Sequence, residues 1–152
     1  MKLSEALIQR ADAQKRLAQL RQRINQNALI QEGTRPSEDP KDLLAELARI
    51  LAELGDLIKR INRTNAATSF DDTRTLTDAL ADRDMLHAEH AALAGLAQAA
   101  VHTYNRYTKS EVKYLSTVNV ADLQKRVDEL ARRIRDLDTR IQALNWEVDL
   151  VE

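Results

Sequence analysis

The sequence has no cysteine, only three glycines and two prolines, and few aromatic residues, which make up 3% of its 152 positions. Without cysteine there is no disulfide framework, no thiol nucleophile and no thiolate metal site. An all-β protein needs far more turn residues than these few glycines and prolines supply. A core with few aromatic side chains is built from leucine, isoleucine, valine and alanine, which favours helix packing over a β-sandwich.

An excess of one charge is also lacking, because 23 basic residues stand against 24 acidic ones and the net charge is -1. This balance gives no general attraction to nucleic acid or to an anionic membrane, so we expect neither as a partner. No segment approaches the roughly 18 apolar residues of a membrane span. The opening MKLSEALIQR lacks the apolar core of a signal peptide. We therefore expect a soluble, cytoplasmic protein.

The apolar pattern predicts four long helices in a single domain, at about residues 4–32, 40–62, 75–102 and 120–145. Ser4 and Asp39 are suitable N-caps, and Gly33 is suited to end the first helix. Short connections favour antiparallel neighbours. Residues 1–32 carry six basic and three acidic side chains, whereas 36–60 carry six acidic and four basic. This opposite excess favours pairing of the first two helices. The predicted fold is all-α, with long antiparallel helices in a four-helix or coiled-coil hairpin architecture.

The last predicted helix has the most regular apolar pattern. Its aliphatic residues alternate steps of three and four: Val120, Leu123, Val127, Leu130, Ile134, Leu137, Ile141 and Leu144. Such spacing is typical of the seam of a left-handed coiled coil. We therefore expect at least one coiled-coil hairpin.

The second predicted helix has an unusually wide apolar face. Besides its main stripe it carries Leu44, Leu51 and Ile58, which widen the face. A face of this width contacts more than one neighbour, and one thin four-helix chain is too small to bury it. We therefore expect a homo-oligomer with closed symmetry. The main hypothesis is a structural or interaction protein with a scaffold or assembly role and an unknown protein partner.

A break between helices is expected from Asn62 to Thr75. Residues 111–120 alternate apolar and polar positions, which is compatible with a short strand or an extended connection. A strand needs a partner. The most β-tolerant candidate is 64–70, either in the same chain or in a second one.

Four stretches resemble one bacterial family: INRTNAAT, TLTDALADRDML, YTKSEVKYLSTVNVADLQ and the closing QALNWEVDLVE. It is a group of small helical proteins often labelled septicolysin-like and regarded as a domain of unknown function. The resemblance extends over essentially the whole chain and implies an elongated, all-helical protein that oligomerises. It supplies no catalytic or ligand residues. The toxin activity in the label finds no support in a sequence without cysteine or a secretion signal.

Polar side chains near the helix ends form a candidate site for an anion or a subunit contact. They are Asn62, Arg63, Thr64, Asn65, Arg74, Arg106 and Tyr107, with Lys109 and Ser110. Asparagine and threonine also cap helices and begin turns, and we favour that interpretation of these positions.

The stretch DMLHAEH offers a candidate metal site. It places Asp84, His87 and His90 at steps of three, so two or three of them could share a zinc ion. Histidine pairs at helical spacing are common by chance. A small-ligand or metal-binding protein that uses the polar breaks and His90 is therefore the alternative hypothesis. We expect no cofactor. The sequence contains neither a nucleophile motif nor a glycine-rich phosphate-binding loop, so it gives no indication of an enzyme.

The end of the chain is apolar in alternate positions. It carries Trp146, Val148, Leu150 and Val151 between acidic residues. An undocked tail of this kind would expose an apolar patch. We expect it to contact a partner subunit or the 61–76 region.

Overall fold

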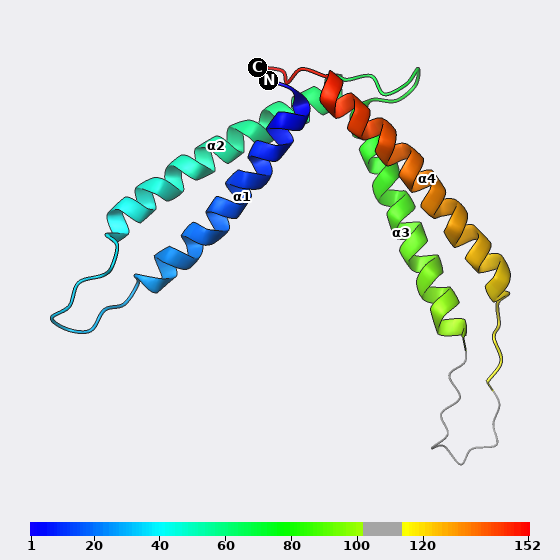
Figure 1. Ribbon diagram of the computed structural model, residues 1–152, viewed down its shortest axis with the longest axis horizontal. Coiled ribbons are helices and arrows are strands. Elements are labelled where there is room, and N and C mark those ends of the chain that lie inside the picture. Colours follow the sequence, from blue (N-terminus) through cyan, green and yellow to red (C-terminus); the bar gives the residue numbers. More distant parts are fainter. Residues whose placement is uncertain (102–113) are drawn as a thin grey trace, which may run out of the picture. The chain divides into compact units, whose positions relative to one another are not determined.

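The computed structural model describes residues 1–101 and 114–152. It contains four α-helices, which are α1 (Leu3–Gln26), α2 (Pro40–Ala67), α3 (Leu76–Ala100) and α4 (Val120–Glu147) (Figure 1). Within those residues there is no β-strand, and the all-α prediction is confirmed. None of the helices in the described ranges combines the length and hydropathy that a membrane crossing requires.

The chain divides into two compact units. The first comprises Met1–Leu76 and Ala143–Glu152, and the second comprises Thr77–Gln142. The helix α4 contributes to both units because its last turn belongs to the first. The expectation of a single domain stays a prediction.

In the first unit, α1 and α2 form an antiparallel pair (Figure 1). Leu20, Leu43 and Ile50 are buried together, with Leu17, Ile24 and Leu47 packed around them. Each fully buried aliphatic side chain of this kind contributes roughly 1.5–3 kcal/mol. Arg16 of α1 forms an ion pair with Glu53 of α2 at 2.6 Å.

The end of α1 differs from the prediction, because the helix stops at Gln26 rather than near residue 32. Asn27 ends it by donating its backbone N–H and its side-chain amide to the Arg23 carbonyl, at 3.2 and 2.9 Å. Gly33 lies in the following loop with a φ of 85°. Its left-handed conformation therefore serves a loop turn and not a helix end.

The end of α2 also differs, and the break expected from Asn62 onward was wrong. The helix continues to Ala67, and within it Thr64 donates its hydroxyl to the Arg60 carbonyl at 2.8 Å. Thr68 then closes it, since its N–H and its hydroxyl both donate to the Thr64 carbonyl.

Of the two alternatives for 111–120, strand pairing with 64–70 does not occur in the residues that the structure describes. Residues 64–67 are helical, and Ser69 instead forms an isolated antiparallel bridge with Thr75. Residues 114–119 are an irregular connection to α4. Residues 111–113 lie outside the described ranges.

The second unit consists of α3 and most of α4, which run side by side (Figure 1). Arg83 pairs with Asp138 at 3.6 Å and Arg126 with Glu89 at 3.2 Å, as expected for antiparallel neighbours. The seam residues of α4 from Leu123 to Ile141 are buried. The coiled-coil geometry itself stays a prediction.

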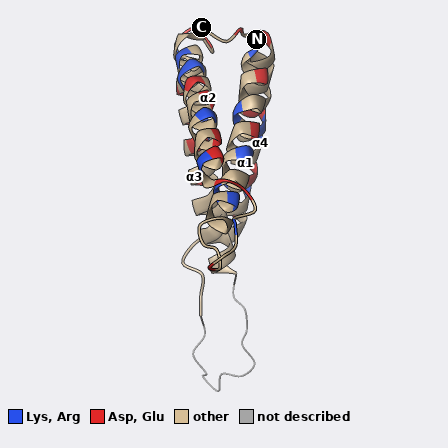
Figure 2. Cartoon of the chain, turned by 90° about the vertical axis from the view of Figure 1, so that its left-hand side faces the viewer, with Lys and Arg blue, Asp and Glu red and all other residues tan. Residues whose placement is uncertain are grey.

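Charge of both signs is distributed along the helices, without a large patch of one sign in the view of Figure 2. Most of the ion pairs are at least partly exposed, so each contributes little to stability. The aliphatic cores therefore carry most of the stability of the two helix pairs.

The core of the α1–α2 pair can be tested at Leu20, whose side chain is fully buried. We expect Leu20→Ala to lower the free energy of unfolding by about 2–5 kcal/mol, because it removes buried methyl groups and leaves a cavity. Leu29→Ala is the matched control, since Leu29 is almost fully exposed, and we expect a change below about 0.5 kcal/mol. Urea unfolding followed by circular dichroism measures both values. Equal effects of the two substitutions would contradict this packing.

Candidate functional site

The two ends of the chain meet in the first unit. The Leu3 N–H donates to the Val148 carbonyl and the Leu150 N–H donates to the Met1 carbonyl, both at 2.9 Å. Between them, Lys2 and Asp149 form an isolated antiparallel bridge. Figure 1 shows the termini next to each other. These hydrogen bonds fix the apolar tail to the start of α1.

The tail also binds the C-terminal part of α2. The Val151 N–H donates to the Thr64 hydroxyl at 3.0 Å, and the Arg60 guanidinium donates to the Val151 carbonyl at 3.1 Å. Thr64 is almost fully buried, as is its helix neighbour Ile61. The Thr64 hydroxyl thus accepts from the tail while it donates to its own helix, which leaves this buried oxygen fully satisfied.

Lys2 provides the charged contact of this junction. Its ammonium donates to the Glu147 carbonyl at 2.9 Å and pairs with the Asp149 carboxylate at 2.9 Å. The Glu147 carbonyl lies in the last turn of α4, where a cation is favourable. The hydrogen bond from Lys2 also lowers the pKa of Asp149.

The four apolar tail residues have different environments. Leu150 is buried and Val148 is half-buried. Trp146 is 60% exposed and Val151 is 43% exposed. Docking onto α1 and α2 therefore accounts for Leu150 and Val148, whereas most of the indole of Trp146 stays available at the surface.

The loop between α2 and α3 is organised by Asp71. Its carboxylate accepts from the backbone N–H groups of Thr73 and Arg74, at 3.1 and 2.9 Å, and from the Arg74 guanidinium at 2.9 and 2.6 Å. The Arg74 guanidinium also lies over the Phe70 ring, 5.1 Å from its centroid. The hydrogen bonds from Arg74 hold the pKa of Asp71 far below its usual value. Arg74 therefore shapes this loop.

The remaining polar candidates do not form a group in the described residues. Asn62 and Arg63 are exposed on α2, Asn65 is half-buried, and Thr64 is used by the helix and the tail. Arg106 and Tyr107, with Lys109 and Ser110, lie outside the described residues. An anion site at these positions stays a prediction.

The candidate metal residues are all on α3. Asp84 and His87 are exposed and His90 is half-buried. The Asp84 carboxylate lies 3.4 Å from the Arg83 guanidinium. Across residues 1–101 and 114–152, no three histidine or acidic side chains are close enough together to hold a metal ion.

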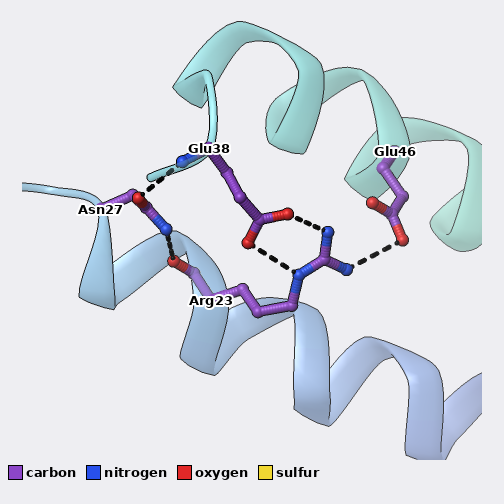
Figure 3. Close-up of polar contacts among 4 residues, drawn as sticks. All are labelled: Arg23, Asn27, Glu38 and Glu46. Atoms are coloured by element: carbon purple, nitrogen blue, oxygen red, sulfur yellow. Dashed lines mark hydrogen bonds and ion pairs between the residues drawn. The ribbon is translucent and has the colours of Figure 1, made fainter. Parts of the chain in front are cut away.

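One polar cluster was not among the sequence-based candidates (Figure 3). The Arg23 guanidinium donates to Glu38 at 3.1 and 2.5 Å and to Glu46 at 3.3 Å. Asn27 accepts from the Glu38 backbone N–H at 3.0 Å. The hydrogen bonds to Glu38 raise the pKa of Arg23 and lower the pKa of Glu38. This cluster joins the end of α1, the loop and the start of α2, and the opposite charge excess of the two helices was its only signal in the sequence.

Comparison with known proteins places the chain in a family. The family model described as a family of unknown function, DUF6847, matches residues 10–150. The chain belongs to DUF6847. A solved structure described as that of a functionally unknown conserved protein from Corynebacterium diphtheriae is similar over 99% of each chain, with 40% sequence identity and a TM-score of 0.94. No curated protein matches the sequence.

The sequence-based resemblance to a family of unknown function is thus confirmed at that level. The septicolysin label appears neither in the DUF6847 description nor in that of the Corynebacterium diphtheriae protein. Both descriptions leave the activity of DUF6847 open.

The tail junction can be tested at Leu150, the buried residue of the tail. We expect Leu150→Ala to lower the free energy of unfolding by about 2–5 kcal/mol. Trp146→Ala is the control, because most of its side chain is exposed, and we expect less than half that effect. Denaturant unfolding gives both values. A larger loss for Trp146→Ala would show that the indole, and not Leu150, anchors the tail.

The Asp71 loop predicts a pH-dependent contribution to stability. Because the folded state lowers the pKa of this carboxyl, its contribution is complete above the unfolded pKa of about 4 and is lost as pH falls through the folded pKa. We expect Asp71→Asn to have a lower melting temperature than the wild type at pH 7. The difference should shrink below about pH 4. Asp72→Asn, at the exposed neighbouring position, is the control, and a pH-independent difference for Asp71→Asn would contradict this account.

Proposed function

We propose that this DUF6847 protein is a structural or interaction protein that works as a homo-oligomer through its long helices. The observation that carries this proposal is the second apolar stripe of α2. Leu44, Leu51 and Ile58 are 55%, 49% and 37% exposed, although the stripe facing α1 is buried. The residues that widen the apolar face of α2 in the sequence are thus the ones that are exposed.

The cost of leaving this stripe in water supports the proposal. A large aliphatic side chain contributes roughly 1.5–3 kcal/mol when it is fully buried. Scattered exposed aliphatic residues are common, but three at one-heptad intervals line up along one side of the helix. Covering these residues with a further helix would stabilise the protein.

A second exposed apolar region supports the same conclusion. On α3, Met85 and Leu96 are exposed, and the stretch from Ala91 to Ala100 has no charged residue. A helix that is apolar on all sides is normally covered by neighbours. Two helices of the chain therefore have more apolar surface than their own unit buries.

A scaffold role is also consistent with how the charged residues are used. Arg23 and Arg74 hold loops, and Lys2 holds the tail. In each case the charged group has a local structural partner. The charged clusters of the first unit thus have a structural explanation, which leaves its apolar surfaces as the main basis for an interaction.

Native mass spectrometry of the purified full-length protein tests the proposal. We expect a homo-oligomer with an even number of subunits, because closed assemblies with twofold interfaces are the commonest kind. Light scattering coupled to gel filtration checks the same mass in solution. A protein that is monomeric at every concentration up to high micromolar would contradict the proposed function.

A further inference from the structure

The exposed stripe of α2 belongs to a longer seam with a regular spacing. Six residues follow one another at steps of four and three: Leu44, Ala48, Leu51, Gly55, Ile58 and Asn62. Five of them are exposed and Gly55 is half-buried. We call these six residues the α2 seam. Alternating steps of four and three keep one line of side chains facing a partner helix along its whole length.

The charged residues of α2 are kept off this seam. Glu46 and Glu53 point toward α1, where they pair with Arg23 and Arg16. The seam itself holds four aliphatic residues, one glycine and one asparagine. It is therefore suited to contact an apolar helix.

We propose that the α2 seam binds the α2 seam of a second copy of this chain, in antiparallel orientation. This inference rests on the proposed function, because it names the surface through which the homo-oligomer forms. Its basis is the symmetry of the seam about Glu53. When two antiparallel copies are centred on Glu53, residues equally far from Glu53 on opposite sides face each other. Each such pair joins a larger residue of one copy to a smaller or polar residue of the other: Leu51 with Gly55, Ile58 with Ala48, and Leu44 with Asn62.

Large residues opposite small ones fit the way helices pack. In an antiparallel pair of seams each layer then has a similar total volume, so the two helices can keep one separation along their length. A parallel pair would instead place Leu51 against Leu51 and Gly55 against Gly55. That arrangement alternates crowded layers with empty ones, which leaves cavities. The sequence of the seam therefore favours the antiparallel orientation.

Gly55 also supports the antiparallel orientation. Glycine in the middle of a helix is destabilising relative to alanine. No described atom would lie within 4 Å of a Cβ atom at this position, so packing in the described parts of the chain gives no reason for a glycine there. In the proposed pair, Gly55 lies opposite Leu51 of the second copy and gives that side chain room.

The first test is Leu51→Glu, which places a charge in the middle of the seam. Leu51 is outside the buried cluster of α1 and α2, so the helix content and melting profile should show a folded chain. We expect the dissociation constant of the α2-mediated contact to rise by about a hundredfold or more, measured by sedimentation velocity over a concentration series. Leu29→Glu is the matched control, because Leu29 is exposed in the loop that follows α1, and it should leave this constant unchanged.

The second test reports the orientation directly. The natural chain has no cysteine, so Leu51→Cys and Gly55→Cys can each be made as the sole thiol. We expect oxidation of an equimolar mixture to give mainly the mixed disulfide between the two variants. Disulfides mainly between identical variants would show a parallel pair and overturn the proposed orientation.

The outcomes separate this inference from the proposed function. An oligomeric wild type whose mass and dissociation constant are unaffected by Leu51→Glu would overturn the α2 seam and leave the homo-oligomer standing. A wild type that is monomeric throughout would overturn both. Loss of the oligomer in Leu51→Glu, together with the mixed disulfide, would support the antiparallel seam.

Discussion

The buried hydroxyl group of Thr64 links the tail of the chain to the inside of α2. It donates to the Arg60 carbonyl inside α2 and accepts from the Val151 N–H of the tail. The bond to Arg60 joins residues four apart, as in a helix, and α2 does not end at Asn62 but continues to Ala67. The tail in turn accepts from the first turn of α1 through the Val148 carbonyl. Helix-terminal N–H groups need such partners, and the last residues of the chain supply one. These hydrogen bonds thus connect the C-terminal part of α2, the tail that follows α4 and the start of α1.

The sequence predicted the four helices because their aliphatic residues repeat at helical spacing over many turns. It failed at the helix ends, where the signals are short and the partners are distant. Asn27 ends α1 with the help of Glu38 in the next loop, and nothing near Asn27 marks it as a stronger stop than Gly33. Likewise, Thr64 looks like a turn residue until its contact with Val151 is known. The pairing of Lys2 with Asp149 joins opposite ends of the chain, and no local pattern encodes it.

The candidate sites show the same division between local pattern and distant partner. The polar stretch around Arg74 made this residue a candidate for an anion site or a subunit contact, but its guanidinium pairs with Asp71 and lies over Phe70, which stabilises the loop. Arg23 was not among the candidates, although its contacts with Glu38 and Glu46 connect three segments. Spacing along the chain shows which residues share a helix face. This spacing does not show which loop packs against that face. The loop contact determines whether a charged side chain stabilises the fold or stays accessible to a ligand.

The low aromatic content has a consequence for the whole architecture. Aliphatic side chains fill a two-helix interface well, but a pair of helices buries only one stripe of each. The buried and exposed stripes of α2 are adjacent, since Leu43 and Leu44, Ile50 and Leu51, and Leu57 and Ile58 are neighbours in sequence. A helix that packed only against α1 would need just the buried residues Leu43, Ile50 and Leu57. Leu44, Leu51 and Ile58 add exposed apolar area and do not strengthen the contact with α1. Their regular recurrence is therefore better explained by a further helix packing against α2 than by the stability of the pair itself.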